Sequence, residues 1–141
     1  MGQNDKIHSV PADPSQWSEK SQHSVSFNYV KEYNDIAYNC WHCKKSAVFS
    51  AADQKYTYEV KKASIDQRRI LCTDCWRELL GIDRDIEHCR QQWAESKKSL
   101  RLNKAFLTNW LRLLTSREGY VPYRPDIAAK NMLRKLLDLP G

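Results

Sequence analysis

Two short cysteine pairs are the residues in this chain whose type and spacing could do chemistry. Cys40 and Cys43 enclose Trp-His, and Cys72 and Cys75 enclose Thr-Asp. Each pair can present two thiols from one tight turn, so two turns can surround one metal ion tetrahedrally, with zinc–sulfur distances of about 2.3 Å. Because four protein ligands leave no open position for water or substrate, the pattern predicts a closed, structural zinc site.

Other uses of these cysteines stay open on the pattern alone. Iron in a rubredoxin-like site is the rival metal, although Lys44 and Trp76 follow the pairs where glycines commonly let amides approach the sulfurs. A dithiol redox centre at Cys40 and Cys43 would require a βαβ unit with the first cysteine at a helix N-terminus. Two lysines and a short apolar run follow instead, so a thiol redox or metal-handling role is a secondary hypothesis.

Three other residues with ligand chemistry lie close to these pairs or beyond them. His42 lies inside the first pair, and because both flanking cysteines are available we expect it to be a partly exposed neighbour. His88 and Cys89 could replace a ligand. However, Cys89 shares helical spacing with Ile86 and Trp93, and a cysteine on such an apolar stripe behaves as a small hydrophobic residue.

Composition limits the classes of protein to which the chain can belong. Its 141 residues suit one domain, or a small domain with appendages, and no apolar run approaches the roughly 18 residues of a membrane span. The first twenty residues are polar, so we expect no secretory signal. Five cysteines without such a signal predict metal ligands plus one thiol in a reducing cytoplasm.

The organisation along the chain predicts an α+β fold. We expect a flexible polar tail over 1–23, a zinc-binding module over 24–81 and a helical, basic region over 82–141. Alternating apolar residues predict a strand over 24–29, and Ser50 fits the N-cap of a short helix. Two or three C-terminal helices follow, one over about 100–114 and a last one capped by Asp126.

The stretch 29–77 resembles a family of small bacterial proteins described as a probable zinc ribbon and as treble-clef-like. The resemblance lies in Tyr38 before the first pair, the Gln-Lys-Tyr-x-Tyr-Glu-Val block at 54–60, and the Cys-x-x-Cys-Trp-Arg run at 72–77. The central block is its more specific part, because paired cysteines alone are widespread. The resemblance implies zinc binding and no known catalytic residues, and it does not reach the C-terminal helices.

We therefore predict a non-enzymatic zinc-binding protein that acts as a binding or adaptor module. The chain has no serine–histidine–aspartate arrangement, phosphate loop or paired-carboxylate context that stands out. Residues 97–141 carry ten Lys or Arg against three Asp or Glu, so the expected partners are a protein, or RNA or DNA. The alternative is that the cations form the solvated faces of amphipathic helices. The candidate nucleic-acid contacts are Lys97, Lys98, Arg101, Lys104 and Arg112.

Overall fold

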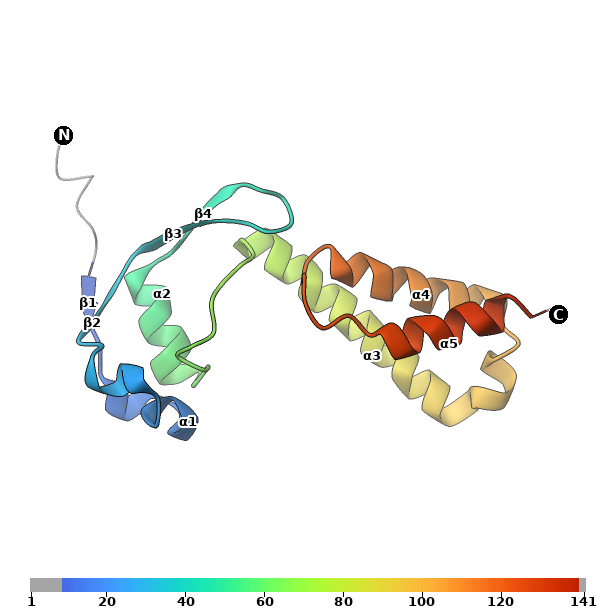
Figure 1. Ribbon diagram of the computed structural model, residues 1–141, viewed down its shortest axis with the longest axis horizontal. Helices are drawn as coiled ribbons and strands as arrows, with labels where there is room; N and C mark the ends of the chain where they lie inside the picture. The colour runs from blue at the N-terminus through green and yellow to red at the C-terminus, as the bar shows by residue number, and fades with distance from the viewer. Residues whose placement is uncertain (1–8, 140–141) are drawn as a thin grey trace. The chain divides into compact units, whose positions relative to one another are not determined.

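Residues 9–139 are described by the computed structural model, in which the chain divides into two units (Figure 1). The first unit contains the residues up to Cys40 together with 44–72. The second contains 41–43 and everything from Thr73 onward. The boundary expected after residue 81 falls inside the helix Thr73–Leu100, which departs from helical geometry at Ser96 and not at Gly81. A glycine costs a helix only about 1 kcal/mol and does not by itself end it.

The first unit begins with a strand that the sequence does not predict. β1 (Ser9–Pro11) pairs antiparallel with β2 (Glu32–Asn34), and the short helices η2 (Pro14–Gln16) and α1 (Glu19–Gln22) follow β1. Of the expected tail 1–23, residues 1–8 lie outside the described residues, and 9–23 differ from the prediction because they are folded. The reason is Trp17, which is only 2% exposed and whose indole N–H donates a hydrogen bond to Tyr33 Oη at 2.8 Å.

The strand expected over 24–29 is wrong: η3 (Val25–Asn28), a 3-10 helix, occupies this stretch. The Ser24 hydroxyl caps it by accepting a hydrogen bond from the Ser26 N–H. The alternating apolar pattern does not mark a buried face, because Val25 and Tyr29 are both 74% exposed. Phe27 packs edge-on against Trp17, with ring centroids 6.4 Å apart.

A second hairpin presents the first cysteine pair. β3 (Ile36–Asn39) and β4 (Ser46–Phe49) are antiparallel, with Ile36 opposite Phe49 and Asn39 opposite Ser46. The predicted capping of the next helix is confirmed, since the Ser50 hydroxyl accepts from the Asp53 N–H. That helix, α2 (Ala51–Lys55), continues as the π-helical η4 (Tyr56–Val60). The core of the first unit consists of Trp17, Tyr33, Phe49, Ala51 and Tyr58.

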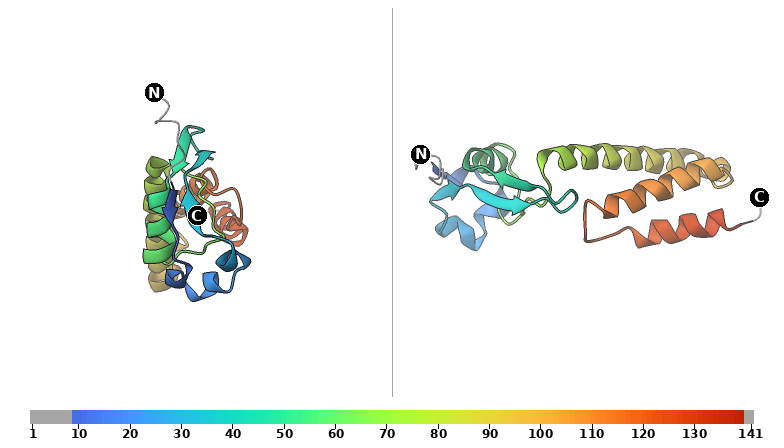
Figure 2. Two further views of the ribbon diagram at one scale, coloured as in Figure 1. Left: turned by 90° about the vertical axis from the view of Figure 1, so that its left-hand side faces the viewer. Right: turned by 90° about the horizontal axis from the view of Figure 1, so that it is seen from above.

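The second unit is a bundle of three helices: α3 (Thr73–Leu100), α4 (Lys104–Glu118) and α5 (Ile127–Leu137). They alternate in direction, and the two views in Figures 1 and 2 show α5 ending beside the α3–α4 connection. The predicted cap of α5 by Asp126 is confirmed. α4 starts at Lys104 rather than near residue 100, because the Asn103 side chain caps it by accepting from the Phe106 N–H.

Leucines and a tryptophan hold the bundle together. Its fully buried residues lie at helical spacing on the three helices, which explains why the apolar periodicity was a sufficient guide to their existence. None of the helices within 9–139 combines the length and the apolar character needed to cross a bilayer. The buried core residues are Ile86, Cys89, Leu107, Trp110, Leu113, Leu114 and Leu133. The α+β fold class is confirmed.

Candidate metal centre

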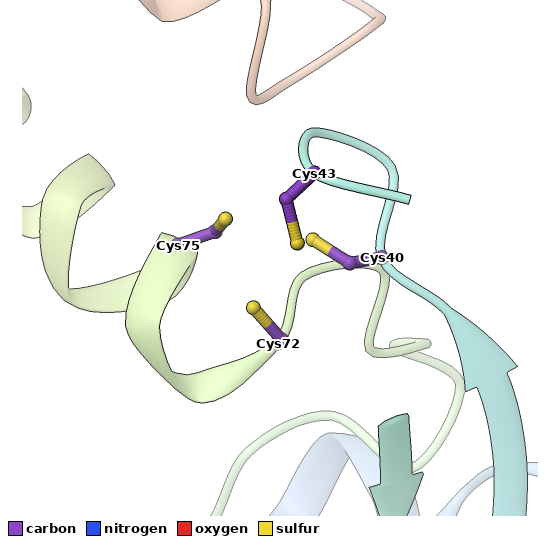
Figure 3. A group of neighbouring side chains, drawn as sticks. All are labelled: Cys40, Cys43, Cys72 and Cys75. Atoms are coloured by element: carbon purple, nitrogen blue, oxygen red, sulfur yellow. The ribbon is translucent and has the colours of Figure 1, made fainter. Parts of the chain in front are cut away.

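The structure brings together the four cysteines that the sequence singles out. Their Sγ atoms all lie within 4.8 Å of one another (Figure 3). Cys40 directly follows β3 and Cys43 lies in the turn of the β3–β4 hairpin. Cys72 immediately precedes α3, and Cys75 is its third residue. The sulfurs therefore come from a hairpin turn and a helix N-terminus that are about thirty residues apart in the chain.

Backbone hydrogen bonds shape the first turn. The Cys40 N–H donates to the Lys45 carbonyl at 2.8 Å, and the Lys44 N–H donates to the Cys40 carbonyl at 2.9 Å. Lys44 adopts the left-handed conformation (φ 67°), which glycine enters at no steric cost and which is less favourable for lysine. The turn thus reaches the required geometry without the glycine that often follows such a pair.

The second turn uses the start of a long helix. Since the unpaired N–H groups of a helix N-terminus carry partial positive charge, they favour negative groups placed there. Cys72 and Cys75 lie at this end of α3, so the negative charge of thiolates bound to a metal ion would lie beside the positive end of the helix.

The donor set and its spacing fit one zinc ion. Four sulfurs at about 2.3 Å from a common centre form a tetrahedron with edges of about 3.8 Å, only about 1 Å shorter than the upper limit of the observed separations. Cys40 and Cys75 are buried, Cys72 is half-buried and Cys43 is exposed, so the cluster lies at the surface with a shielded interior side. An all-thiolate tetrahedral set suits zinc.

A hydrogen bond within the first unit links the approaches to the two cysteine pairs. The Tyr38 hydroxyl, two residues before Cys40, donates to the carbonyl of Leu71, which directly precedes Cys72; the distance is 2.8 Å. Burial raises the pKa of Tyr38, against the opposing effect of the nearby Arg69, so the hydroxyl keeps the proton that it donates. Sequence reasoning places Tyr38 before the pair but does not predict this bond, which joins residues 33 positions apart.

The His42 side chain contacts other residues of the second unit, to which residues 41–43 belong. Its ring stacks on Tyr120, with centroids 3.8 Å apart and planes 8° from parallel, and its Nδ1 lies 3.1 Å from the Gly119 carbonyl oxygen. The group of potential metal ligands found within residues 9–139 contains the four cysteines and not His42. The expectation of an exposed neighbour is confirmed, whereas no sequence signal indicates the contact with residues 119 and 120.

Cys89 is a core residue, as its position on an apolar stripe predicts. It is 4% exposed and packs with Ile86 in the bundle. Burial, together with the negative charge of Asp85, raises the pKa of the Cys89 thiol, so this cysteine stays neutral. His88 beside it is exposed, and neither residue joins the cysteine cluster described above.

The five candidate nucleic-acid contacts are all exposed, but they do not form one group. Lys97 and Lys98 lie in the last turn of α3, and Arg101 and Lys104 lie at the α3–α4 connection. Arg112 lies two turns further along α4, about 12 Å from Lys104 along the helix axis. It donates a hydrogen bond to Asn109 Oδ1 at 2.8 Å.

Comparison with known families identifies the region around the cysteines. The family described as a probable treble clef domain matches residues 34–80, which include both cysteine pairs, the β3–β4 hairpin, α2 and the start of α3. Residues 34–80 are thus similar to a treble clef domain, and they contain the four clustered cysteines. This match agrees with the resemblance that the sequence shows over 29–77, and most of the helical unit lies outside it. No curated protein and no solved structure matches the chain.

Proposed function

We propose that the chain is a non-enzymatic zinc protein, in which one zinc ion is bound by the four cysteines and the helical unit makes contact with a partner. The observation that carries the proposal is the convergence of four Sγ atoms to within 4.8 Å from two turns distant in sequence. The treble clef match over the same residues supports it independently.

A structural role follows from the number of ligands. Catalytic zinc sites use three protein ligands and keep the fourth position for water or substrate, whereas four cysteine thiolates occupy all four positions. When bound, the zinc would supply folding energy, on the order of 10–16 kcal/mol by analogy with zinc-finger peptides. A segment as short as residues 34–80 buries little apolar surface, so a contribution of this size from zinc would decide whether the segment folds.

The chain's own residues would organise the site around that ion. Cys40 and Cys75 are buried, so their sulfurs would be shielded from solvent when they bind the ion. The positive end of α3 would lie beside the negative charge of the site. The Tyr38–Leu71 hydrogen bond holds the chain directly before Cys40 near the chain directly before Cys72. These positioning contacts are those expected of a permanent scaffold.

Metal analysis tests the proposal directly. Protein purified without added metal should be colourless and contain one zinc per chain with no iron. Cys89→Ala, which removes the cysteine outside the cluster, should keep that stoichiometry. A red, iron-containing protein would establish the rubredoxin-like alternative, and a folded protein without metal would refute the zinc proposal.

Alkylation separates the structural role from the thiol redox alternative. A thiol reagent should react slowly with Cys40, Cys43, Cys72 and Cys75 in the zinc-loaded protein and rapidly after chelation, because a thiolate bound to zinc is a weaker nucleophile. If Cys43 or another cysteine of the cluster reacts at the rate of an ordinary exposed thiol while zinc stays bound, the structural assignment fails.

A further inference from the structure

The fold gathers cations from three separate helix ends into one region, which we call the basic end. α3 finishes there, α4 begins there, and α5 finishes there (Figures 1 and 2). Arg134 and Lys135 occupy the last turn of α5, about thirty residues beyond the other cations in the sequence. The six exposed cations of the basic end are Lys97, Lys98, Arg101, Lys104, Arg134 and Lys135.

Acidic residues do not neutralise these cations. Glu95 and Asp138 are the acidic residues in the adjoining turns, so six positive charges face two negative ones. Among residues 9–139, none of the six cations forms an ion pair or a side-chain hydrogen bond; Lys97 lies 5.8 Å from the centre of the Trp93 ring.

Three cations elsewhere in the bundle form ion pairs, whereas Arg77, Arg84, Arg112 and Arg124 form none within the described residues. Arg117 Nε lies 2.6 Å from Asp83 Oδ1, and Arg90 Nη2 lies 3.3 Å from Asp126 Oδ2. Lys130 pairs with Glu118. Within residues 9–139 the ion pairs of the bundle thus lie around the α4–α5 connection, and the basic end differs in gathering six cations that form none.

Helix stability explains only part of this charge. Cations in the last turns of α3 and α5 interact favourably with the helix dipole. Lys104, however, is the first residue of α4, where the dipole disfavours a cation, and that first turn contains no acidic residue. An external anion would find both the Lys104 ammonium group and the positive end of α4 at this point, together with the Arg101 guanidinium nearby in the chain.

We propose that the basic end binds the phosphates of a nucleic acid, which would be the partner of the helical unit in the function proposed above. A membrane-binding helix carries its cations along one amphipathic stripe beside a broad apolar face. Here the cations come from three helix ends, and the large apolar side chains exposed among them are Leu102 and Leu139. Arg112 lies outside the basic end and is not part of the surface.

The number of cations sets the expected dependence on salt. Six phosphate contacts to duplex DNA would give a slope of log K against log salt near −5, so affinity would fall about 10³-fold between about 50 and 200 mM salt. At about 0.1 M salt each contact contributes roughly eightfold in affinity, so removal of two contacts would weaken binding roughly 60-fold.

A pair of matched variants tests the location. Arg134→Gln with Lys135→Gln removes two charges from the basic end, and Lys20→Gln with Lys31→Gln removes two exposed charges from the first unit. Fluorescence anisotropy of zinc-loaded full-length protein would be measured with a labelled duplex DNA and a labelled single-stranded RNA of about 20 nucleotides. The α5 pair should weaken binding to the duplex roughly 60-fold and reduce the magnitude of the duplex slope by about two. The control pair should change affinity less than threefold.

Replacement of the other four cations of the basic end by glutamine, at 97, 98, 101 and 104, should abolish most of the remaining salt dependence of the affinity for nucleic acid. Circular dichroism and zinc content would show that the variants are folded. Failure of the intact protein to bind either nucleic acid at about 50 mM salt would overturn the proposal. Equal effects of the two charge pairs would also overturn it, and so would tighter binding to phosphatidylserine vesicles than to either nucleic acid.

The zinc content of the same samples separates this inference from the proposed function. Zinc-loaded protein that binds no nucleic acid would refute the inference and leave the structural zinc intact. Protein that lacks zinc but binds nucleic acid with the predicted dependence on 134 and 135 would refute the zinc centre and leave the basic end as the contact surface.

Discussion

Replacement of one of the four clustered cysteines, Cys72→Ser, should weaken the proposed zinc binding by about two to three orders of magnitude. A binding free energy of about 10–16 kcal/mol shared by four sulfurs gives about 2.5–4 kcal/mol for each, which is about 10²–10³ in affinity. Within residues 9–139 the candidate ligand group consists of the four cysteines, so the variant keeps three of them. At saturating zinc the free energy of unfolding of the treble clef domain should fall by a similar amount.

Chelator competition measures this loss of affinity directly. Wild type and variant would each be titrated with a zinc indicator of known affinity, and unfolding by urea would be followed at saturating zinc. Cys43→Ser is a useful companion variant, because Cys43 is exposed and its replacement loses little packing. The two variants should therefore show comparable losses of zinc affinity, while a larger loss of stability in Cys72→Ser would report its packing.

Two controls isolate the role of the sulfurs. Cys89→Ala removes a cysteine from the bundle core, and His42→Ala removes the imidazole inside the first pair; both variants should keep one zinc per chain. An affinity for zinc within about threefold of the wild type in Cys72→Ser would refute the four-thiolate centre. A loss of zinc in His42→Ala as large as that in Cys72→Ser would show that the imidazole is a ligand.

Three further predictions concern the rest of the fold. Tyr33→Phe should destabilise the first unit by about 3 kcal/mol. The substitution leaves the buried Trp17 N–H without its acceptor and removes the hydroxyl that donates to Glu59 at 2.7 Å. Urea unfolding would measure the change, and a loss below about 1 kcal/mol would contradict this. Burial alone would raise the pKa of Glu59, but hydrogen bonds from the Asp13 N–H, Tyr33 and Lys55 outweigh it and lower the pKa below its usual value. The Glu59 carboxylate therefore stabilises the first unit at pH values above its unfolded-state pKa, and this contribution should be lost as the pH falls through the lower folded-state pKa. In Glu59→Gln the free energy of unfolding should depend less on pH in that acid range. A pH dependence equal to that of the wild type would exclude the assignment. Leu133→Ala should cost about 2–5 kcal/mol and loosen α5, which amide hydrogen exchange would detect; unchanged protection of α5 would contradict the packing described.

Local sequence signals were sufficient where a few neighbouring residues decide the structure. Ser50 and Asp126 each cap a helix through a hydrogen bond to an N–H three residues later, so the signal and its effect lie within one turn. Paired cysteines likewise determine each half of the four-cysteine cluster locally. The strand expected over 24–29 failed because alternation alone carries no information about what covers each face: Val25 and Tyr29 remain exposed.

The sequence by itself determined which four cysteines form the cluster, the α+β class and the existence of the C-terminal helices, because spacing within a turn and apolar periodicity are local properties. Only the tertiary structure decided that residues 9–23 fold, since the buried Trp17 needs Tyr33 as a partner and β1 needs β2. It also decided that Arg134 and Lys135 join the cations of the α3–α4 connection, while Arg112 does not. These outcomes depend on which distant segments pack together, and composition and periodicity describe each segment without specifying its neighbour.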